Sequence, residues 1–229
     1  MRRIINFFPF LLIFSGCFFE QKEPIDGTEF SKNFIQVYIV VDDMMQCFYD
    51  KSLNTINIFF DGEMVSQRGN TNYGNPTEER FNALSNYYED ITFNRKLVPY
   101  INYAVLDQFS INVTCDRDFN NYPAKTSLNE IIEFIGSSPY KFIKSGYNLK
   151  YDWSETEIEK YGKLGRIQKY GYHLVNKKMS EITISDMILL NQVAYLTFTE
   201  KPVSGEYTFT ITLKSDDKEF VRNINITFE

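Results

Sequence analysis

Apolar and polar side chains alternate along the last part of the chain, and this pattern constrains the fold more than any other feature. In Tyr207–Leu213, aromatic and aliphatic residues occupy every second position, and threonines stand between them. The alternation resumes in Phe220–Ile226, where Arg222 is the polar exception. A period of two is typical of a strand with one buried face. Because Ser215–Lys218 separate the two segments, we predict a β-hairpin that ends the domain.

Strand-like segments recur through most of the chain. Phe34–Val41 is a continuous apolar run rich in β-branched residues, which favours a strand buried on both faces. Aromatic residues make up 17% of the sequence, and they also favour strands over helices. Asp61-Gly62 is typical of a turn, since glycine adopts a positive φ without steric cost. The other predicted strands are Cys47–Tyr49, Ile56–Phe60, Leu97–Val105, Phe109–Val113 and Val193–Thr199.

Two segments carry helical signals. Ser127–Glu130 has the spacing of a capping box and precedes the apolar run Ile131–Ile135, so we predict a short helix that Gly136 closes. Glu78–Tyr88 is a second candidate, although its apolar spacing is poor. With roughly eight to ten short strands, the pattern predicts a mainly β fold, an antiparallel immunoglobulin-like sandwich with one or two short helices.

The first residues carry the signals of an exported protein. Two arginines precede a short apolar run, Ile4–Phe14, and Ser15-Gly16-Cys17 closes it. A charged start, an apolar centre and small residues before the cut are typical of a secretory signal peptide, and a membrane-spanning helix would need roughly 20 apolar residues. The cysteine after the small pair resembles a bacterial lipoprotein precursor, cut between Gly16 and Cys17 and lipidated on the thiol. A plain signal with a chance cysteine and a buried N-terminal strand are the alternatives.

These signals predict three parts: a signal peptide over residues 1–16, a lipidated tether over 17–33, and one β-sandwich domain over 34–229. Several acyl chains, at about 0.8 kcal/mol per buried CH₂, anchor a protein stably. We therefore expect an outer-membrane lipoprotein of a bacterial cell envelope, facing the periplasm or the cell surface. Glu20–Glu23 resembles the export signal of some Bacteroidetes surface lipoproteins, and a solvated linker is the alternative.

The net charge limits the choice of partners. Cleavage removes Arg2 and Arg3, so the net charge changes from −6 to −8. This acidic balance argues against nucleic acid as a partner, because phosphate binding needs a basic face.

Two stretches, Val113–Glu130 and Pro202–Phe228, read VTCDRDFNNYPAKTSLNE and PVSGEYTFTITLKSDDKEFVRNINITF. Together with the lipoprotein start, they resemble a family of Bacteroidetes lipoproteins catalogued as a domain of unknown function. The family pattern has glycine where Lys125 stands in this chain. The resemblance implies an extracytoplasmic β-rich domain in the cell envelope, and it carries no catalytic residues to transfer.

Side chains that suggest catalysis or metal binding are few. Asp116–Asn120 has the first three ligand spacings of a calcium loop but lacks its glycine and its bidentate glutamate, so we favour hydrogen bonds to the turn backbone. His173 is the one histidine, and we expect it on a strand face. Cys47 and Cys115 could form a disulfide outside the cytoplasm or remain buried thiols. We expect no cofactor, no metal and no catalytic residue.

Tyrosines gather among lysines in Tyr147–Tyr172. Aromatic faces flanked by polar groups suit a glycan platform, for which Trp153, Tyr151 and Tyr170 are the candidate ligand-binding residues. The alternative is that these tyrosines fill sheet edges and loops. We therefore expect a non-enzymatic envelope lipoprotein with an interaction or structural role, with a glycan-binding surface lipoprotein as the alternative and a hydrolase as the third choice. Its partners would be the membrane, through Cys17, and a glycan or another envelope protein.

Overall fold

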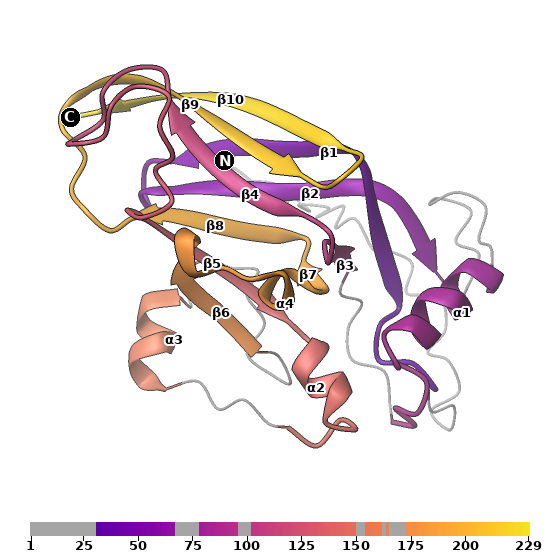
Figure 1. The fold of residues 1–229 in the computed structure, drawn as a ribbon. Helices are drawn as coiled ribbons and strands as arrows, with labels where there is room; N and C mark the ends of the chain where they lie inside the picture. Colours follow the sequence, from indigo (N-terminus) through magenta and orange to yellow (C-terminus); the bar gives the residue numbers. More distant parts are fainter. Residues whose placement is uncertain (1–30, 67–77, 96–101, 150–153, 162–163, 165–172) are drawn as a thin grey trace, which may run out of the picture.

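The structure, a computed structural model, describes residues 31–66, 78–95, 102–149, 154–161, 164 and 173–229. The predicted signal peptide and Cys17 lie outside these residues, as do Trp153, Tyr151 and Tyr170. The described chain is mainly β and forms two sheets (Figure 1). The largest of its three hydrophobic clusters contains buried residues from both sheets. Across the same residues, none of the helices is long and apolar enough to cross a membrane.

The larger sheet has seven strands in the order β6-β5-β8-β2-β1-β3-β7. It is curled, so that its edge strand β7 returns towards β5. Ser138 Oγ, at the end of β5, donates a hydrogen bond of 2.7 Å to the carbonyl oxygen of Ile188, just before β7. The strands are β1 (Val37–Asp50), β2 (Thr55–Ser66), β3 (Asn102–Val105), β5 (Ile132–Ser138), β6 (His173–Lys178), β7 (Leu190–Asn191) and β8 (Val193–Phe198).

The smaller sheet contains β4 (Ser110–Cys115), β9 (Gly205–Lys214) and β10 (Glu219–Phe228), in the order β10-β9-β4. The predicted C-terminal hairpin is confirmed, because β9 and β10 pair along their whole length. In its turn, the amide of Ser215 donates to the carbonyl oxygen of Lys218 at 2.8 Å. Figure 1 shows this sheet lying over β1 and β2 at the top of the molecule.

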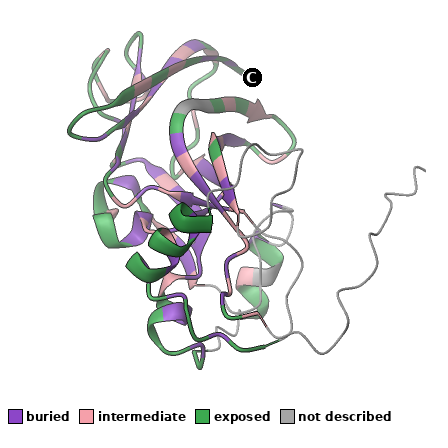
Figure 2. Ribbon diagram, turned by 90° about the vertical axis from the view of Figure 1, so that its right-hand side faces the viewer, coloured by how far each residue is buried: buried purple, intermediate pink, exposed green. Residues whose placement is uncertain are grey.

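Phe119, in the loop after β4, lies at the centre of an aromatic cluster in this core. Its ring centroid is 5.1 Å from the centroids of Phe198, Tyr207 and Phe209, and its side chain is fully buried. Aromatic pairs at such distances add about 0.5–1.5 kcal/mol each beyond their burial. The buried positions run along the strands, whereas the helices are largely exposed (Figure 2).

Two sheets give the domain its layers, but an immunoglobulin-like sandwich is not confirmed. The expected arrangement was wholly antiparallel, and the larger sheet is mixed as well as curled. Val37–Val40 of β1 pair in parallel with Asn102–Val105 of β3. Parallel neighbours need a long crossover connection, which the residue pattern within a strand does not reveal.

The predicted turn at Asp61-Gly62 is wrong, because both residues lie inside β2. They face a bulge in β1, where the pairing shifts between Val41 and Met44. A Cβ on Gly62 would lie 2.1 Å from the carbonyl oxygen of Val40, a distance that no side chain could occupy. The glycine is therefore required by the close approach of two backbones rather than by a turn.

The predicted helix at Ile131–Ile135 is also wrong, because Ile132–Ile135 form the first part of β5. Phe134 packs in the main core cluster and Ile135 in a second one, so alternate side chains are buried on both faces. Ser127 does not start a helix: its hydroxyl donates to Asn112 Oδ1 at 2.6 Å. Pairing with β6 and β8 thus overrides the local capping signal.

The predicted helix at Glu78–Tyr88 is confirmed by α1 (Glu78–Tyr87), which buries Phe81 and Ser85. The expectation of one or two helices is too low, although the further ones are short. They are α2 (Tyr140–Lys144), α3 (Glu155–Tyr161), α4 (Ile184–Met187) and a 3₁₀ turn, η2 (Met179–Glu181).

Candidate functional site

The expected aromatic platform lies largely outside the described residues, since Trp153, Tyr151 and Tyr170 are not among them. Two tyrosines of the same segment are described, and both are buried. Tyr147 is 3% exposed and Tyr161 is 2% exposed. These two side chains therefore fill cores and present no face to a glycan.

The Asp116–Asn120 loop uses its polar side chains to hold backbone amides: Asp118 bonds the turn itself, as the turn interpretation expected, whereas Asp116 bonds the distant strand β9. Asp116 Oδ1 accepts a hydrogen bond from the amide of Thr208 at 3.0 Å, and this bond is the main reason why the pKa of Asp116 lies below its usual value. Asp118 Oδ1 accepts from the amide of Ala124 at 2.8 Å. Within the described ranges, no group of three metal-ligating residues could hold an ion.

A hollow of about 480 Å³ opens beside this loop, at the end of the smaller sheet. Binding sites for small molecules typically enclose about 300–1,000 Å³, so the hollow has the size of a ligand site. The polar side chains of its wall are those of Asp116, Arg117, Glu206, Thr208, Asn225 and Thr227. Two carboxylates, one guanidinium, two hydroxyls and one amide therefore converge on the same space. We call it the hollow below.

Arg117 is held in place at the hollow by the ring of Tyr207. Its guanidinium carbon lies 4.5 Å from the ring centroid, a cation–π contact worth about 0.5–2 kcal/mol. Gly205, at the start of β9, leaves room for it, because a Cβ there would lie 3.2 Å from Arg117 Nη2. Tyr207 itself is only 7% exposed, so the arginine and not the aromatic ring is offered to a ligand.

Rows of hydroxyl and amide side chains continue from the hollow along the outer face of β9 and β10. Thr208 Oγ1 donates to Asn225 Oδ1 at 3.0 Å, and Thr210 Oγ1 donates to Asn223 Oδ1 at 2.9 Å. The alternation that buries the aromatic side chains turns these residues to the opposite face. The sequence therefore already showed a polar outer face, although it did not show the hollow.

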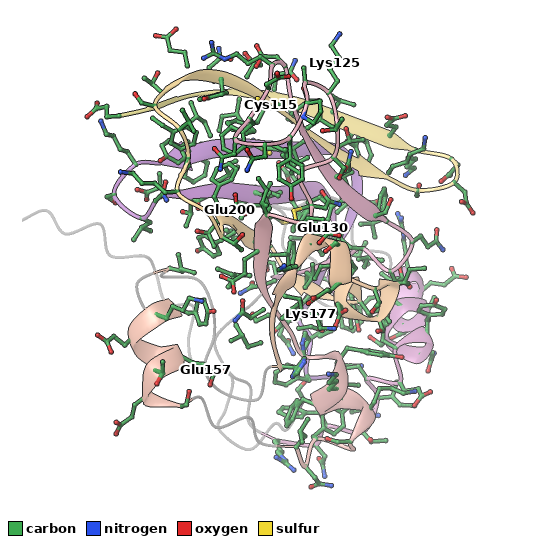
Figure 3. All side chains as sticks on the ribbon, turned by 60° about the vertical axis from the view of Figure 1, so that its left-hand side comes forward. Cys115, Lys125, Glu130, Glu157, Lys177 and Glu200 are labelled. Atoms are coloured by element: carbon green, nitrogen blue, oxygen red, sulfur yellow. The ribbon has the colours of Figure 1, made fainter. Side chains whose placement is uncertain are left out.

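Lys125 stands in a loop position that has a left-handed backbone conformation. Its φ is +64°, in the left-handed region that glycine adopts at lower cost. The amide of Lys125 donates to the carbonyl oxygen of Cys115 at 2.7 Å, and both residues lie at the upper end of the molecule in Figure 3. A glycine at this position would suit the loop that borders the hollow.

Asp90 lies in the segment after α1 and forms hydrogen bonds with residues at the beginning of the described chain. Its carboxylate is fully buried and accepts hydrogen bonds of 2.8 Å from the amides of Phe34 and Ile35, and one of 2.9 Å from the Tyr147 hydroxyl. Burial raises the pKa of Asp90, and these hydrogen bonds oppose that rise. Asn33 donates to the carbonyl oxygen of Asp90, so three consecutive residues are held.

The hollow and the start of the described chain lie at opposite ends of the molecule. Ser31 pairs with Arg95, which follows α1 in the chain. In Figure 1, α1 lies at the lower right, whereas the end of β10, marked C, lies at the upper left. Thr227, near the end of β10, lines the hollow.

Both described cysteines are free thiols, so the disulfide considered from the sequence is not formed. Cys115 is buried in the core cluster, and burial raises the pKa of its thiol. Burial also raises the pKa of Cys47 to about 12. Both side chains therefore behave as the small hydrophobic groups of the alternative interpretation.

His173 begins β6, as the sequence led us to expect, and lies next to Lys141 of α2. Its Nε2 is 2.8 Å from Lys141 Nζ, so the ammonium donates to a neutral imidazole. Burial lowers the pKa of His173, and the charge of Lys141 lowers it further. Lys177, on the same strand, holds Asp186 through two contacts of 2.8 Å. Figure 3 shows Lys177 far below Cys115, so this charged group is separate from the hollow.

Comparisons of the chain with protein-family models, with curated proteins and with solved structures give no match.

Proposed function

We propose that this chain is a non-enzymatic lipoprotein of a bacterial cell envelope, anchored through Cys17, whose β domain binds a partner at the hollow. The lipid anchor is inferred from the sequence. The described domain contributes a polar hollow of ligand size, whose wall side chains are fixed by contacts such as that of Arg117 with Tyr207. From the sequence patterns we also propose that the chain belongs to the lipoprotein family that it resembles and that its domain is immunoglobulin-like.

The observation that carries the binding role is the position of the hollow relative to Ser31, the first described residue. A lipid at Cys17 would attach the domain at Ser31, beside α1, where Asp90 fixes the first residues. The hollow lies at the other end of the domain, so attachment at Ser31 leaves it uncovered (Figure 1). An uncovered surface is available to a partner outside the membrane.

The lipid anchor is tested by changing Cys17→Ala in the full chain and separating membranes from soluble fractions. We expect the variant to leave the membrane fraction, because a chain without acyl groups has no stable anchor. Cys115→Ala is the matched control, since it changes a buried thiol of the domain and leaves the anchor intact. Retention of the Cys17 variant on membranes would refute the anchor.

The alternative is a glycan-binding lipoprotein that uses Trp153, Tyr151 and Tyr170. It is favoured by the aromatic and basic composition of that segment alone. Binding on a glycan array that disappears with Trp153→Ala, and persists when residues of the hollow are changed, would favour this alternative over the hollow.

A further inference from the structure

We infer that the hollow binds a short, neutral oligosaccharide. The inference rests on the proposed function, because it names the ligand class of the same surface. It locates the carbohydrate site at β9, β10 and the loop after β4 rather than at Trp153.

The charges in the hollow select against anionic ligands. Asp116 and Glu206 repel an anion, and the phosphates of a nucleic acid would meet both carboxylates. Arg117, whose guanidinium the ring of Tyr207 keeps beside the hollow, offsets one of these two negative charges and so weakens the attraction for a cation. A neutral polar ligand avoids the repulsion and does not depend on the remaining charge.

The hydrogen-bonding groups of the hollow match a ligand that offers both donors and acceptors. The two carboxylates accept, the guanidinium donates, and the hydroxyls and the amide can do either. Sugar hydroxyl groups have this double character, so a carbohydrate can use every group of the wall.

Several of these groups are held before a ligand arrives. Asp116 is fixed by the amide of Thr208 at 3.0 Å, and the Thr208 hydroxyl is fixed on Asn225 at 3.0 Å. Groups that are already ordered lose little conformational freedom on binding, which favours affinity for a small ligand. The volume of about 480 Å³ limits the ligand to a short segment of a glycan.

The test is isothermal titration calorimetry on the mature lipoprotein in detergent. The neutral probes are maltotriose, cellotriose and chitotriose, with sialyllactose as the anionic probe and trilysine as the cationic probe. Asn225→Ala removes an amide of the hollow. Asn223→Ala is the matched control, because it lies on the same strand face, pairs with Thr210 as Asn225 pairs with Thr208, and lies outside the hollow.

We expect at least one neutral trisaccharide to bind, and Asn225→Ala to raise its Kd by at least about tenfold, while Asn223→Ala changes it by less than about twofold. The ligand class is overturned if no trisaccharide binds, if both variants weaken binding equally, or if sialyllactose or trilysine binds more tightly. The two failures can be told apart. If the protein binds no trisaccharide but still needs Cys17 for membrane attachment, the ligand class is wrong and the anchor stands.

Discussion

Replacing Asp90 by alanine tests how the domain holds the end that would carry the tether. The change leaves three donors without their acceptor: the amides of Phe34 and Ile35 and the hydroxyl of Tyr147. Each buried donor left unsatisfied costs about 1–3 kcal/mol. Removing the carboxylate also relieves the cost of burying a charge, which offsets part of this loss. We expect Asp90→Ala to lower the free energy of unfolding by about 3–5 kcal/mol.

Urea unfolding followed by circular dichroism measures this loss. With a slope of about 2 kcal/mol per M, the midpoint should fall by about 1.5–2.5 M. Tyr147→Phe is the graded control, because it removes one of the three donors and should cost about 1 kcal/mol. If Asp90→Ala lowered the midpoint no more than Tyr147→Phe, the two backbone hydrogen bonds would contribute little and our account of this end would be wrong.

Three further predictions concern single positions. Lys125→Gly should stabilise the domain by about 0.5–1 kcal/mol in the same urea assay, because Lys125 has a φ of +64°, whereas Lys214→Gly within β9 should destabilise it. Gly62→Ala should cost about 3 kcal/mol or more, since its Cβ would lie 2.1 Å from the carbonyl oxygen of Val40, and a cost below about 1 kcal/mol would contradict this packing. Because the pKa of His173 is lowered in the folded state, the unfolded chain binds its proton first. Stability should therefore fall as the pH falls through about 6.5, and His173→Gln should remove that part of the pH dependence in thermal unfolding scans.

The features predicted well from the sequence depend on neighbours along the chain. The C-terminal hairpin is the clearest example, because the alternation in Tyr207–Leu213 and the turn at Ser215–Lys218 specify it locally. The helix α1 was also found, although its apolar spacing is poor. The expected hydrogen bond to the turn backbone is found at Asp118, which accepts from the amide of Ala124.

The features that were missed depend on contacts between distant residues. A capping signal precedes β5 and an apolar run begins it, but the strand lies between β6 and β8, which follow it in the chain by tens of residues. Gly62 faces the bulge in β1, so its role depends on the partner strand. The hollow joins Asp116 to Thr208, 92 residues later, and no local pattern brings these two together. The threonines that alternate with apolar residues in β9 were the one sequence signal for the polar outer face beside the hollow.

The central claim is that a lipid at Cys17 attaches the domain at the end opposite the hollow, so that the hollow lies farther from the membrane than the attachment point does. The most direct test is energy transfer from a fluorophore on the mature lipoprotein to acceptor lipids in vesicles, with the fluorophore at Thr227 or at Ile91. Thr227 lines the hollow, whereas Ile91 is 46% exposed beside Asp90. We expect clearly weaker transfer from Thr227 than from Ile91. Equal transfer, or stronger transfer from Thr227, would contradict the claim.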